Sequence, residues 1–291
     1  MEQQYKIENN GSLVLKHIFE CGQCFRWNEE LDGSYTGVFK NNVLNAKEQN
    51  HQIIFDGICD GDIKEIVTQY FDLDRDYDDI KNKLSKIDEP LKNSIDYGNG
   101  IRLLNQDLWE TTISFIISAN NNIPRIKGII ERMARRYGNK IEWKGNEYYT
   151  FPTPEELKDV TVEDYRKLGT GFRDIRLYET VHMILDKKVN LEEMQNNSNT
   201  LEVREQLLTL SGVGPKVADC ILLFSTLKRF EVFPIDVWVR RVMNELYIKN
   251  EDETKVNKKE IEKLAHEKFG NLAGIAQRQM CIRDRHIILK K

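Results

Sequence analysis

Residues 207–243 decide the fold, and they read LLTLSGVGPKVADCILLFSTLKRFEVFPIDVWVRRVM. Two apolar segments flank a turn in which Gly212 and Gly214 allow tight backbone geometry and expose N–H groups. Pro215 suits the first position of a helix, because its missing N–H has no helical partner there. A glycine turn that opens a helix favours phosphate binding, and Lys216 lies in the first turn of this helix. The stretch therefore predicts a phosphate-binding hairpin with a lysine beside it.

The size and composition of the chain indicate a folded protein of about two domains. It has 291 residues, of which 40% are hydrophobic and 31% are charged. No apolar run approaches the roughly eighteen residues that a membrane-spanning helix needs. The polar start MEQQYKIENNG lacks the apolar core of a signal peptide. We therefore expect a cytoplasmic protein, nucleoid-associated if bacterial.

The distribution of charge is more informative than the net charge of −4. Residues 51–100 contain twelve acidic and six basic residues, whereas residues 125–144 contain seven basic and two acidic ones. A basic run of this kind is either a surface for nucleic acid or a solvated helix face. The charge pattern alone does not decide between the two.

The cysteines favour neither disulfides nor a metal site. Their number is odd and their spacing scattered, which argues against a disulfide framework. A zinc site or an iron–sulfur cluster would need more ligands near the lone Cys21-Gly-Gln-Cys24 motif. We therefore expect ordinary thiols and no metal. The five residues are Cys21, Cys24, Cys59, Cys220 and Cys281.

The apolar periodicity predicts an α+β protein, with a sheet first and helices after it. Short strands are predicted at 12–19, 24–28, 34–39, 43–47 and 52–56, which form an antiparallel sheet. From residue 62 the spacing becomes helical. A loop or small hairpin is expected over 143–151. Helices are predicted near 62–70, 77–87, 90–97, 108–119, 123–137, 154–157, 162–168, 174–186, 191–195, 203–210, 215–224, 237–247 and 258–269.

Lys216 and Asp236 are the candidate catalytic residues. A neutral primary amine can attack a sugar C1′ and form a Schiff base, and a helix N-terminus and partial burial both favour the neutral form. Lys216 can equally contact phosphate as a point charge in a non-enzymatic DNA-binding hairpin. Asp236 is placed to cap the helix that begins near Val237, and in addition either to stabilise positive charge at C1′ or to help deprotonate an amine.

Four further residues are candidates for contacts with DNA bases. Asn120 begins a run of three amides, which either cap a helix or hydrogen-bond base edges. Arg125 and Arg173 lie in first turns of helices, where a cation opposes the helix dipole, so either a ligand or solvent accounts for them. Phe172 follows a second glycine turn and is either a wedge between bases or a core residue.

Taken together, these motifs resemble a known family. LSGVGPKVADC followed by FPIDVWVRRV resembles the helix-hairpin-helix and Pro-x-Asp signature of base-excision DNA glycosylases. The segments GIRLLNQDLWETTISFIISANNNIPRIKGIIERM and ECGQCFRW resemble the 8-oxoguanine DNA glycosylases. The similarity spans residues 12–277. It implies a TBP-like antiparallel sheet domain over 1–104 and an all-α helix-hairpin-helix catalytic domain over 105–277.

The resemblance also implies roles for individual residues at the damaged base. Lys216 matches the nucleophile and Asp236 the catalytic carboxylate. Gly22 matches the glycine whose carbonyl accepts the N7–H that 8-oxoguanine has and guanine lacks. Cys220 matches a thiol on one face of the flipped base, and Gln277 a glutamine that reads its Watson–Crick edge. Pro234 is expected beside the base.

Further residues are implied at the DNA around the lesion. Asn120, Arg125 and Arg173 match residues that fill the vacated helix and hold the estranged cytosine, and Phe172 replaces an intercalating tyrosine. Trp238 stands where some members have a phosphate-binding histidine. The hairpin residues Gly212, Val213 and Gly214 are expected to contact the DNA backbone. No cofactor is required, although the carbonyls of Leu208, Leu210 and Val213 offer a site for a structural cation.

The chain departs from the family pattern after Gln277. The family continues with an apolar helix whose phenylalanine, four residues on, stacks on the base, and here that position is Cys281. Residues 278–291 are expected to form an atypical tail, too charged to be buried as such a helix, and we suspect that they are not native coding sequence.

The predicted function is that of a monomeric, bifunctional 8-oxoguanine DNA glycosylase and AP lyase. It acts on duplex DNA with cytosine opposite the lesion, through a Schiff base on Lys216 and β-elimination. Two alternatives remain: a related glycosylase for another damaged base, and a non-catalytic helix-hairpin-helix DNA-binding protein.

Overall fold

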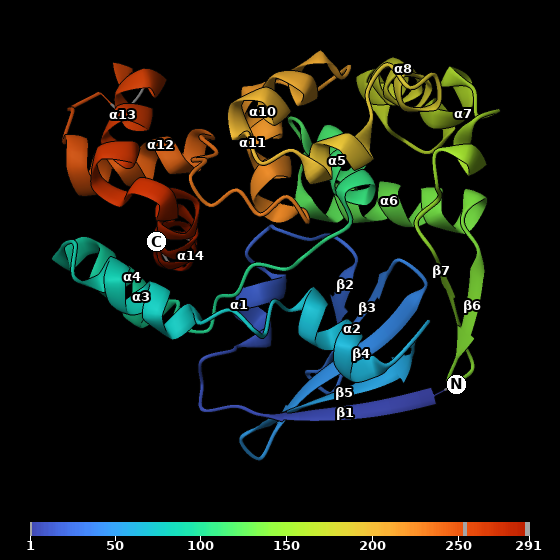
Figure 1. The fold of residues 1–291 in the computed structure, drawn as a ribbon, viewed down its shortest axis with the longest axis horizontal. Helices are drawn as coiled ribbons and strands as arrows, with labels where there is room; N and C mark the ends of the chain where they lie inside the picture. The colour runs from blue at the N-terminus through green and yellow to red at the C-terminus, as the bar shows by residue number, and fades with distance from the viewer. Residues whose placement is uncertain (1, 253–254, 289–291) are drawn as a thin grey trace.

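The architecture places an antiparallel sheet with its own helices against a larger helical part (Figure 1). The computed structural model describes residues 2–252 and 255–288, and side-chain surroundings as far as Ile282. The predicted α+β class, with the sheet first in the chain, is confirmed. Over the described ranges, no helix is long and apolar enough to cross a membrane.

Five antiparallel strands form the sheet in the order β1-β5-β4-β3-β2. Strand β4 lies at the centre, and its Val43 pairs with Val38 of β3 and with Ile58 of β5. Three predicted strands are confirmed to within a few residues, whereas the strand predicted at 24–28 begins only at Trp27. The bounds are β1 (Glu2–Glu8), β2 (Trp27–Glu29), β3 (Tyr35–Phe39), β4 (Asn42–Gln49) and β5 (Gln52–Ile58).

The structure corrects the prediction at the N-terminal end. The strand predicted over 12–19 is wrong, because helix α1 (Leu15–Phe19) occupies its second half. Leu15, Ile18 and Phe19 recur at helical spacing, and all three are buried against the sheet. Strand β1 was not predicted. It is an edge strand of mostly polar residues, and its pairing with β5 depends on backbone hydrogen bonds rather than on an apolar pattern.

Both faces of the sheet are covered. Helices α1 and α2 (Ile63–Tyr70) pack on one face, where the rings of Phe19 and Trp27 stack with centroids 4.2 Å apart. The hairpin β6 (Lys140–Trp143) and β7 (Asn146–Tyr149) covers the other face, and Trp143 packs against Val38 and Val43. The segment expected as a loop or a small hairpin is therefore a hairpin that completes the sheet domain.

The remaining helices follow the predicted periodicity closely, and aspartate and asparagine side chains cap many of their N-termini. The short η turns and the π-helix η3 extend or connect these helices. The bounds are α3 (Tyr77–Ser85), α4 (Glu89–Tyr97), α5 (Leu108–Ser118), α6 (Ile123–Tyr137), η1 (Glu155–Leu157), α7 (Val162–Lys167), η2 (Gly171–Arg173), α8 (Asp174–Leu185), α9 (Leu191–Asn196), α10 (Thr200–Thr209), α11 (Pro215–Phe224), α12 (Val237–Met243), η3 (Asn244–Ile248), α13 (Lys258–Phe269), η5 (Gly270–Leu272) and α14 (Ala273–Ile288).

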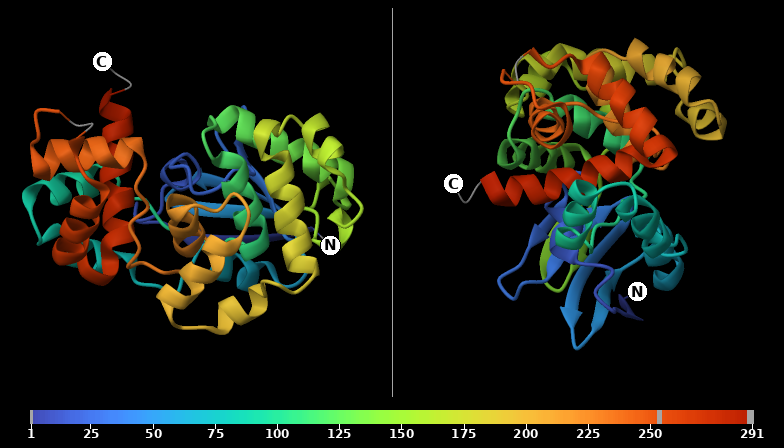
Figure 2. Two further views of the ribbon diagram at one scale, coloured as in Figure 1. Left: turned by 90° about the horizontal axis from the view of Figure 1, so that it is seen from above. Right: turned by 90° about the vertical axis from the view of Figure 1, so that its left-hand side faces the viewer.

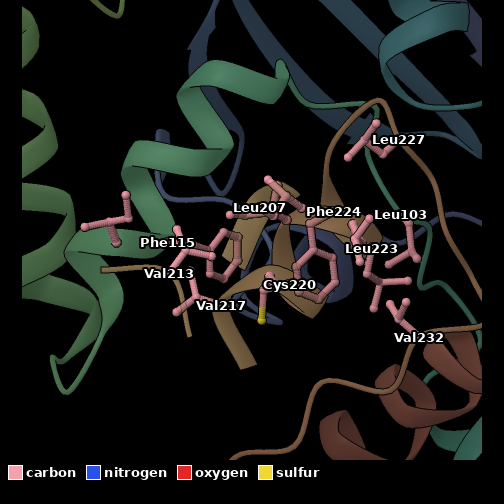
Figure 3. Close-up of a cluster of buried hydrophobic side chains, with 14 of the residues drawn as sticks. Leu103, Phe115, Leu207, Val213, Val217, Cys220, Leu223, Phe224, Leu227 and Val232 are labelled. Carbon is pink, nitrogen blue, oxygen red and sulfur yellow. The ribbon is translucent and has the colours of Figure 1, made fainter. Parts of the chain in front are cut away.

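Helix α11 lies at the centre of the helical part. Its residues from Val217 to Phe224 are all buried, in a core shared with α5 and α10. Figure 3 shows Val217, Cys220 and Phe224 of this helix beside Phe115 of α5. The centroids of the Phe115 and Phe224 rings are 5.6 Å apart in a stacked arrangement. This packing explains the nearly continuous apolar run in the sequence of α11.

The expectation that the C-terminal tail is too charged to be buried as a helix is wrong for its first residues. Residues 278–282 belong to α14 and are buried, with Arg278 6% and Gln279 0% exposed. Helix α14 runs between the sheet domain and the helical layer and contacts α4, as the right-hand view in Figure 2 shows. Arg278 donates a 2.8 Å hydrogen bond from Nη1 to the carbonyl of Cys21, which satisfies part of its polar surface. The end of the tail, 289–291, lies outside the described residues.

Two glutamines, of which Gln23 is buried and Gln106 half-buried, connect the sheet domain to α11. Gln23 is fully buried, and its amide bonds the backbone of Ile18, Arg102 and Leu104. Gln106 donates from Nε2 to the carbonyl of Gln23 at 2.7 Å and to that of Phe224 at 2.9 Å. These bonds hold the loop around residue 22 at a defined position relative to α11.

Candidate active site

A cavity of about 970 Å³ opens between the loop before β2, helices α5 and α11, and the start of α12. Segments from both predicted domains contribute to its wall. Eight of the candidate residues from the sequence line it: Gly22, Asn120, Lys216, Cys220, Pro234, Asp236, Trp238 and Gln277. The structure therefore brings these candidate residues together at one site, whereas the lining residues Lys16, Glu20, Ser118 and Arg278 were not predicted.

The hairpin before α11 presents Lys216 to this cavity. Gly212 has φ +83°, and a Cβ there would lie 3.0 Å from Cδ of Arg176, so glycine suits both the conformation and the space. Val213 donates from its N–H to the carbonyl of Leu210 at 3.1 Å, which closes the turn. Gly214 then caps α11, and a Cβ at this position would meet no atom within 4 Å. The hairpin backbone is therefore accessible to a phosphate group, as the sequence predicts.

The Lys216 side chain lies above an aromatic wall. Its Nζ is 5.4 Å from the ring centroid of Phe115, which also contacts Phe25 and Phe224. Cys220 lies one turn further along α11 and is 3% exposed. Burial raises the pKa of the Cys220 thiol, and the Lys216 charge opposes this rise. Cys220 therefore contributes a neutral thiol to the cavity wall.

The aromatic wall was not predicted from the sequence. Phe115 belongs to a strongly apolar run that reads only as a buried helix, and Phe25 was expected in the core of the sheet. Both phenylalanines line the cavity together with Phe224. No sequence pattern distinguishes a core ring from one that faces a cavity, because the two have the same helical or strand spacing.

Asp236 also lines the cavity, at the N-terminus of α12. Its Oδ1 accepts a 2.9 Å hydrogen bond from the backbone N–H of Val239, so the predicted cap is confirmed. The cap holds the carboxylate at the mouth of the helix. A carboxylate held in this way is preorganised to stabilise a positive charge that develops in the cavity.

Gly22 and Gln277 place polar groups at the cavity. Gly22 has φ +81°, in a loop that the Gln23 hydrogen bonds hold in place. Gln277 is 2% exposed and donates from Nε2 to the carbonyl of Pro234 at 2.9 Å. Its Oε1 accepts a 2.8 Å hydrogen bond from Nε of Arg278, which also lines the cavity. Each end of the amide keeps one further hydrogen-bonding position, because Nε2 carries two N–H groups and Oε1 two lone pairs.

Cys281 does not occupy the position that the resemblance implies. It is buried in the helical core and does not line the cavity, whereas Ile282 does. Cys281 lies one turn of α14 after Gln277 and points into the core, whereas the next residue, Ile282, faces the cavity. An apolar contact to a ligand from this helix therefore comes from Ile282.

The residues predicted to contact the opposite base form a separate group beside the cavity. Only Asn120, which has φ +50°, lines the cavity itself. Arg125 donates from Nη2 to the carbonyl of Gly169 at 3.2 Å. Phe172 is 56% exposed, which excludes the interpretation of this ring as a core residue.

Arg173 is buried beneath Phe172 and beside Asn120. It is 2% exposed, and its Nε donates to the carbonyl of Ala119 at 2.9 Å while Nη1 donates to that of Thr170 at 3.0 Å. Its guanidinium carbon is 4.2 Å from the ring centroid of Phe172. Burial and the neighbouring cations lower the pKa of Arg173. The solvent-facing alternative for this arginine is therefore wrong.

All five cysteines are buried, and none of them forms a disulfide in the part of the chain that the structure describes. Within the described residues, no group of three or more His, Cys, Asp or Glu side chains is arranged to hold a metal ion. The carbonyl of Leu210, one of three suggested for a cation, accepts the hairpin hydrogen bond from Val213.

The fold and the cavity define a helix-hairpin-helix protein with a lysine and an aspartate at one site, and comparison with known proteins identifies its family. Residues 6–112 match the family model of the 8-oxoguanine DNA glycosylase N-terminal domain. Residues 113–269 match that of the HhH-GPD superfamily of base excision DNA repair proteins.

Individual relatives agree with these matches. The N-glycosylase/DNA lyase of Saccharomyces cerevisiae is 32% identical over 82% of this chain and 69% of its own. The 8-oxoguanine glycosylase/lyase of Clostridium acetobutylicum, solved with double-stranded DNA containing cytosine opposite 8-oxoG, is 40% identical with a TM-score of 0.91. That alignment covers 99% of this chain and 98% of the other. The structure of MBOgg1 with a low-affinity DNA ligand is 45% identical with a TM-score of 0.91, and it covers 98% of this chain and 96% of the other.

The chain belongs to the HhH-GPD superfamily of base excision DNA repair proteins, and within it to the 8-oxoguanine DNA glycosylase type. It is a DNA N-glycosylase with lyase activity.

Proposed function

We propose that the protein excises 8-oxoguanine paired with cytosine in duplex DNA and then cleaves the DNA strand at the resulting site. The observation that carries this proposal is the convergence of Lys216, Asp236, Gly22 and Gln277 on one cavity with an aromatic wall. The protein acts as a monomer in the cytoplasm, and its chemistry requires no cofactor. A damaged base leaves the duplex at a cost of about a few kcal/mol and enters the cavity.

The cavity supplies the groups for reading the base. Discrimination from guanine requires only one acceptor for the N7–H, because N7 of guanine is itself an acceptor. A backbone carbonyl at Gly22 provides that acceptor, and the amide of Gln277 provides a donor and an acceptor for the Watson–Crick edge. A site that leaves these groups unpaired rejects the undamaged base.

Lys216 and Asp236 carry the reaction. The neutral Nζ of Lys216 attacks C1′, the bond from C1′ to N9 breaks, and the base leaves with the bonding electrons and takes up a proton. The added amine loses one proton, the bond from C1′ to O4′ breaks, and O4′ takes up a proton, so that the sugar ring opens to a protonated Schiff base. Loss of a C2′ proton then expels the 3′ phosphate by β-elimination. The carboxylate of Asp236 stabilises the positive charge that develops on the sugar.

Borohydride trapping tests this mechanism. Reduction of the Schiff base is expected to link the wild-type protein covalently to an 8-oxoG:C duplex, and Lys216→Gln is expected to abolish the adduct. The conservative variant Lys216→Arg keeps the positive charge for phosphate binding and is also expected to form no adduct. If the wild-type protein yields no adduct, the protein does not act through a lysine nucleophile.

A substrate panel tests the identity of the base. Duplexes with 8-oxoG:C, 8-oxoG:A, 3-methyladenine and thymine glycol are compared under the same conditions. We expect cleavage of 8-oxoG:C to be the most efficient. Activity confined to alkylated bases would identify a different glycosylase, and binding without cleavage of any duplex would indicate a non-catalytic DNA-binding protein.

A further inference from the structure

A third arginine, Arg176, lies between the exposed ring of Phe172 and the hairpin that precedes α11. The guanidinium carbon of Arg176 is 5.3 Å from the centroid of the Phe172 ring. The stem of the same side chain packs on the hairpin, since a Cβ built at Gly212 would lie 3.0 Å from its Cδ. One exposed arginine therefore contacts both the hairpin and the aromatic residue that protrudes beside the cavity.

Helix α8 joins these two elements rigidly. Thr180 donates from Oγ1 to the carbonyl of Ser211 at 2.9 Å, and the Ser211 hydroxyl donates to Oε2 of Glu179 at 2.5 Å. Glu179 and Thr180 both belong to α8, about one turn after Arg176. Arg176 is thus held at a set distance from the backbone N–H groups of the hairpin.

The charges around Arg176 are not balanced by the protein. Arg125 and Arg173 donate to backbone carbonyls, whereas Arg176 makes no hydrogen bond or ion pair with any residue that the structure describes. The nearby carboxylates are engaged elsewhere, because Glu179 accepts from Ser211 and Asp174 pairs with Arg166 at 2.8 Å. Arg176 also contributes to the lowered pKa of Arg173. The donors of Arg176 therefore remain available for an external anion.

We propose that Arg176 binds a DNA backbone phosphate at the edge of the hairpin, between the hairpin and Phe172. This inference rests on the proposed action on duplex DNA. A guanidinium presents paired donors that match a phosphate, and phosphate contacts set the position of a protein on DNA without reading the sequence. Arg176 thus fixes the position of the duplex relative to Phe172. It is a DNA-binding residue and takes no part in the bond-breaking steps.

The dependence of DNA affinity on salt concentration tests this assignment. Each neutralised phosphate contributes about −0.9 to the slope of log affinity against log salt for duplex DNA. Arg176→Gln is expected to make the slope less negative by about 0.9. Between 50 and 200 mM salt, the variant should therefore lose about 3.5-fold less affinity than the wild-type protein loses. Arg176→Lys keeps the charge and is expected to restore most of the slope. The measurement uses fluorescence anisotropy with an undamaged duplex and with an 8-oxoG:C duplex.

Arg135→Gln is the matched control, because Arg135 is also an exposed arginine but lies beside β7, where it pairs with Glu131 at 2.9 Å. Its slope is expected to equal that of the wild-type protein. An unchanged slope in Arg176→Gln overturns the assignment, and so does an equal change in Arg135→Gln. If the wild-type protein excises no 8-oxoguanine but Arg176→Gln alone loses slope, the proposed reaction fails and the phosphate contact is supported.

Discussion

Arg173 holds the backbone of Asn120: its Nη2 donates a 2.8 Å hydrogen bond to the Asn120 carbonyl, and Asn120 has φ +50°. The same guanidinium also bonds the carbonyls of Ala119 and Thr170. Asparagine tolerates the left-handed region better than most residues, but the conformation still needs support from its surroundings. In the free protein, Arg173 therefore positions the turn that presents Asn120 to the cavity. These bonds use four of the five guanidinium N–H groups, so more than one hydrogen bond from Arg173 to a cytosine requires that some of them break.

We expect Arg173→Lys to destabilise the protein and to reduce the preference for cytosine opposite the lesion. The ammonium group cannot reproduce the planar set of donors, and hydrogen bonds to charged groups contribute about 1.5–3 kcal/mol each. A loss of about 2 kcal/mol in the free energy of unfolding is expected in urea titrations. The excision rates on 8-oxoG:C and 8-oxoG:A duplexes should approach each other. Unchanged stability would contradict the structural role.

At Asn120, glycine and alanine are expected to have different effects. Asn120→Gly adopts φ +50° without strain and should leave the free energy of unfolding nearly unchanged. Asn120→Ala should cost about 1 kcal/mol, because alanine is strained in that region. Both variants lose the amide that faces the cavity, so both should excise 8-oxoguanine more slowly in single-turnover assays. Full activity in Asn120→Gly would show that only the backbone turn matters.

Replacement of Asp236 separates its charge from its capping role. Asparagine also caps helices, so Asp236→Asn should keep the hydrogen bond from Val239 and the thermal stability. Asp236→Ala should lose about 1 kcal/mol with the cap. If the carboxylate stabilises the cationic sugar, both variants should slow base excision by about 10²–10⁴-fold. A normal rate in the stable Asp236→Asn variant would exclude that role.

Glu110 in the first turn of α5 should make stability depend on pH. Burial raises the pKa of its carboxyl from an ordinary value of 4.5 to about 7, and Arg26 opposes this rise. Between these two pKa values the folded protein binds a proton that the unfolded chain has released, so folding becomes less favourable as the pH rises from 4.5 to 7. Glu110→Gln should remove this contribution to the pH dependence of stability. We expect the stability of wild type relative to Glu110→Gln, measured in urea at pH 4.5, 5.5, 6.5 and 7.5, to decrease through that window. A constant difference would contradict the raised pKa.

The sequence by itself determined the helical part and the two groups that the proposed reaction uses. The glycine turn before Pro215 has few alternatives to a hairpin that opens a helix, and the spacing in residues 123–137 matches α6 residue for residue. Asp236 was predicted as a helix cap from local pattern alone, and the structure confirms the cap. Local chemistry of this kind can be predicted because capping and turn formation depend on neighbours in the chain.

Only the tertiary structure decided which of these groups face one another. Strand β1 and the bonds of Gln106 depend on partners far along the chain, and no local pattern indicates them. The ring of Phe115 and the buried side of α14 have sequences that suit a plain core and a charged tail, yet both border the cavity. Periodicity shows that a residue is buried, but the packing of several helices decides whether its neighbour is another side chain or an open site. The same packing places Arg176 between the hairpin and Phe172.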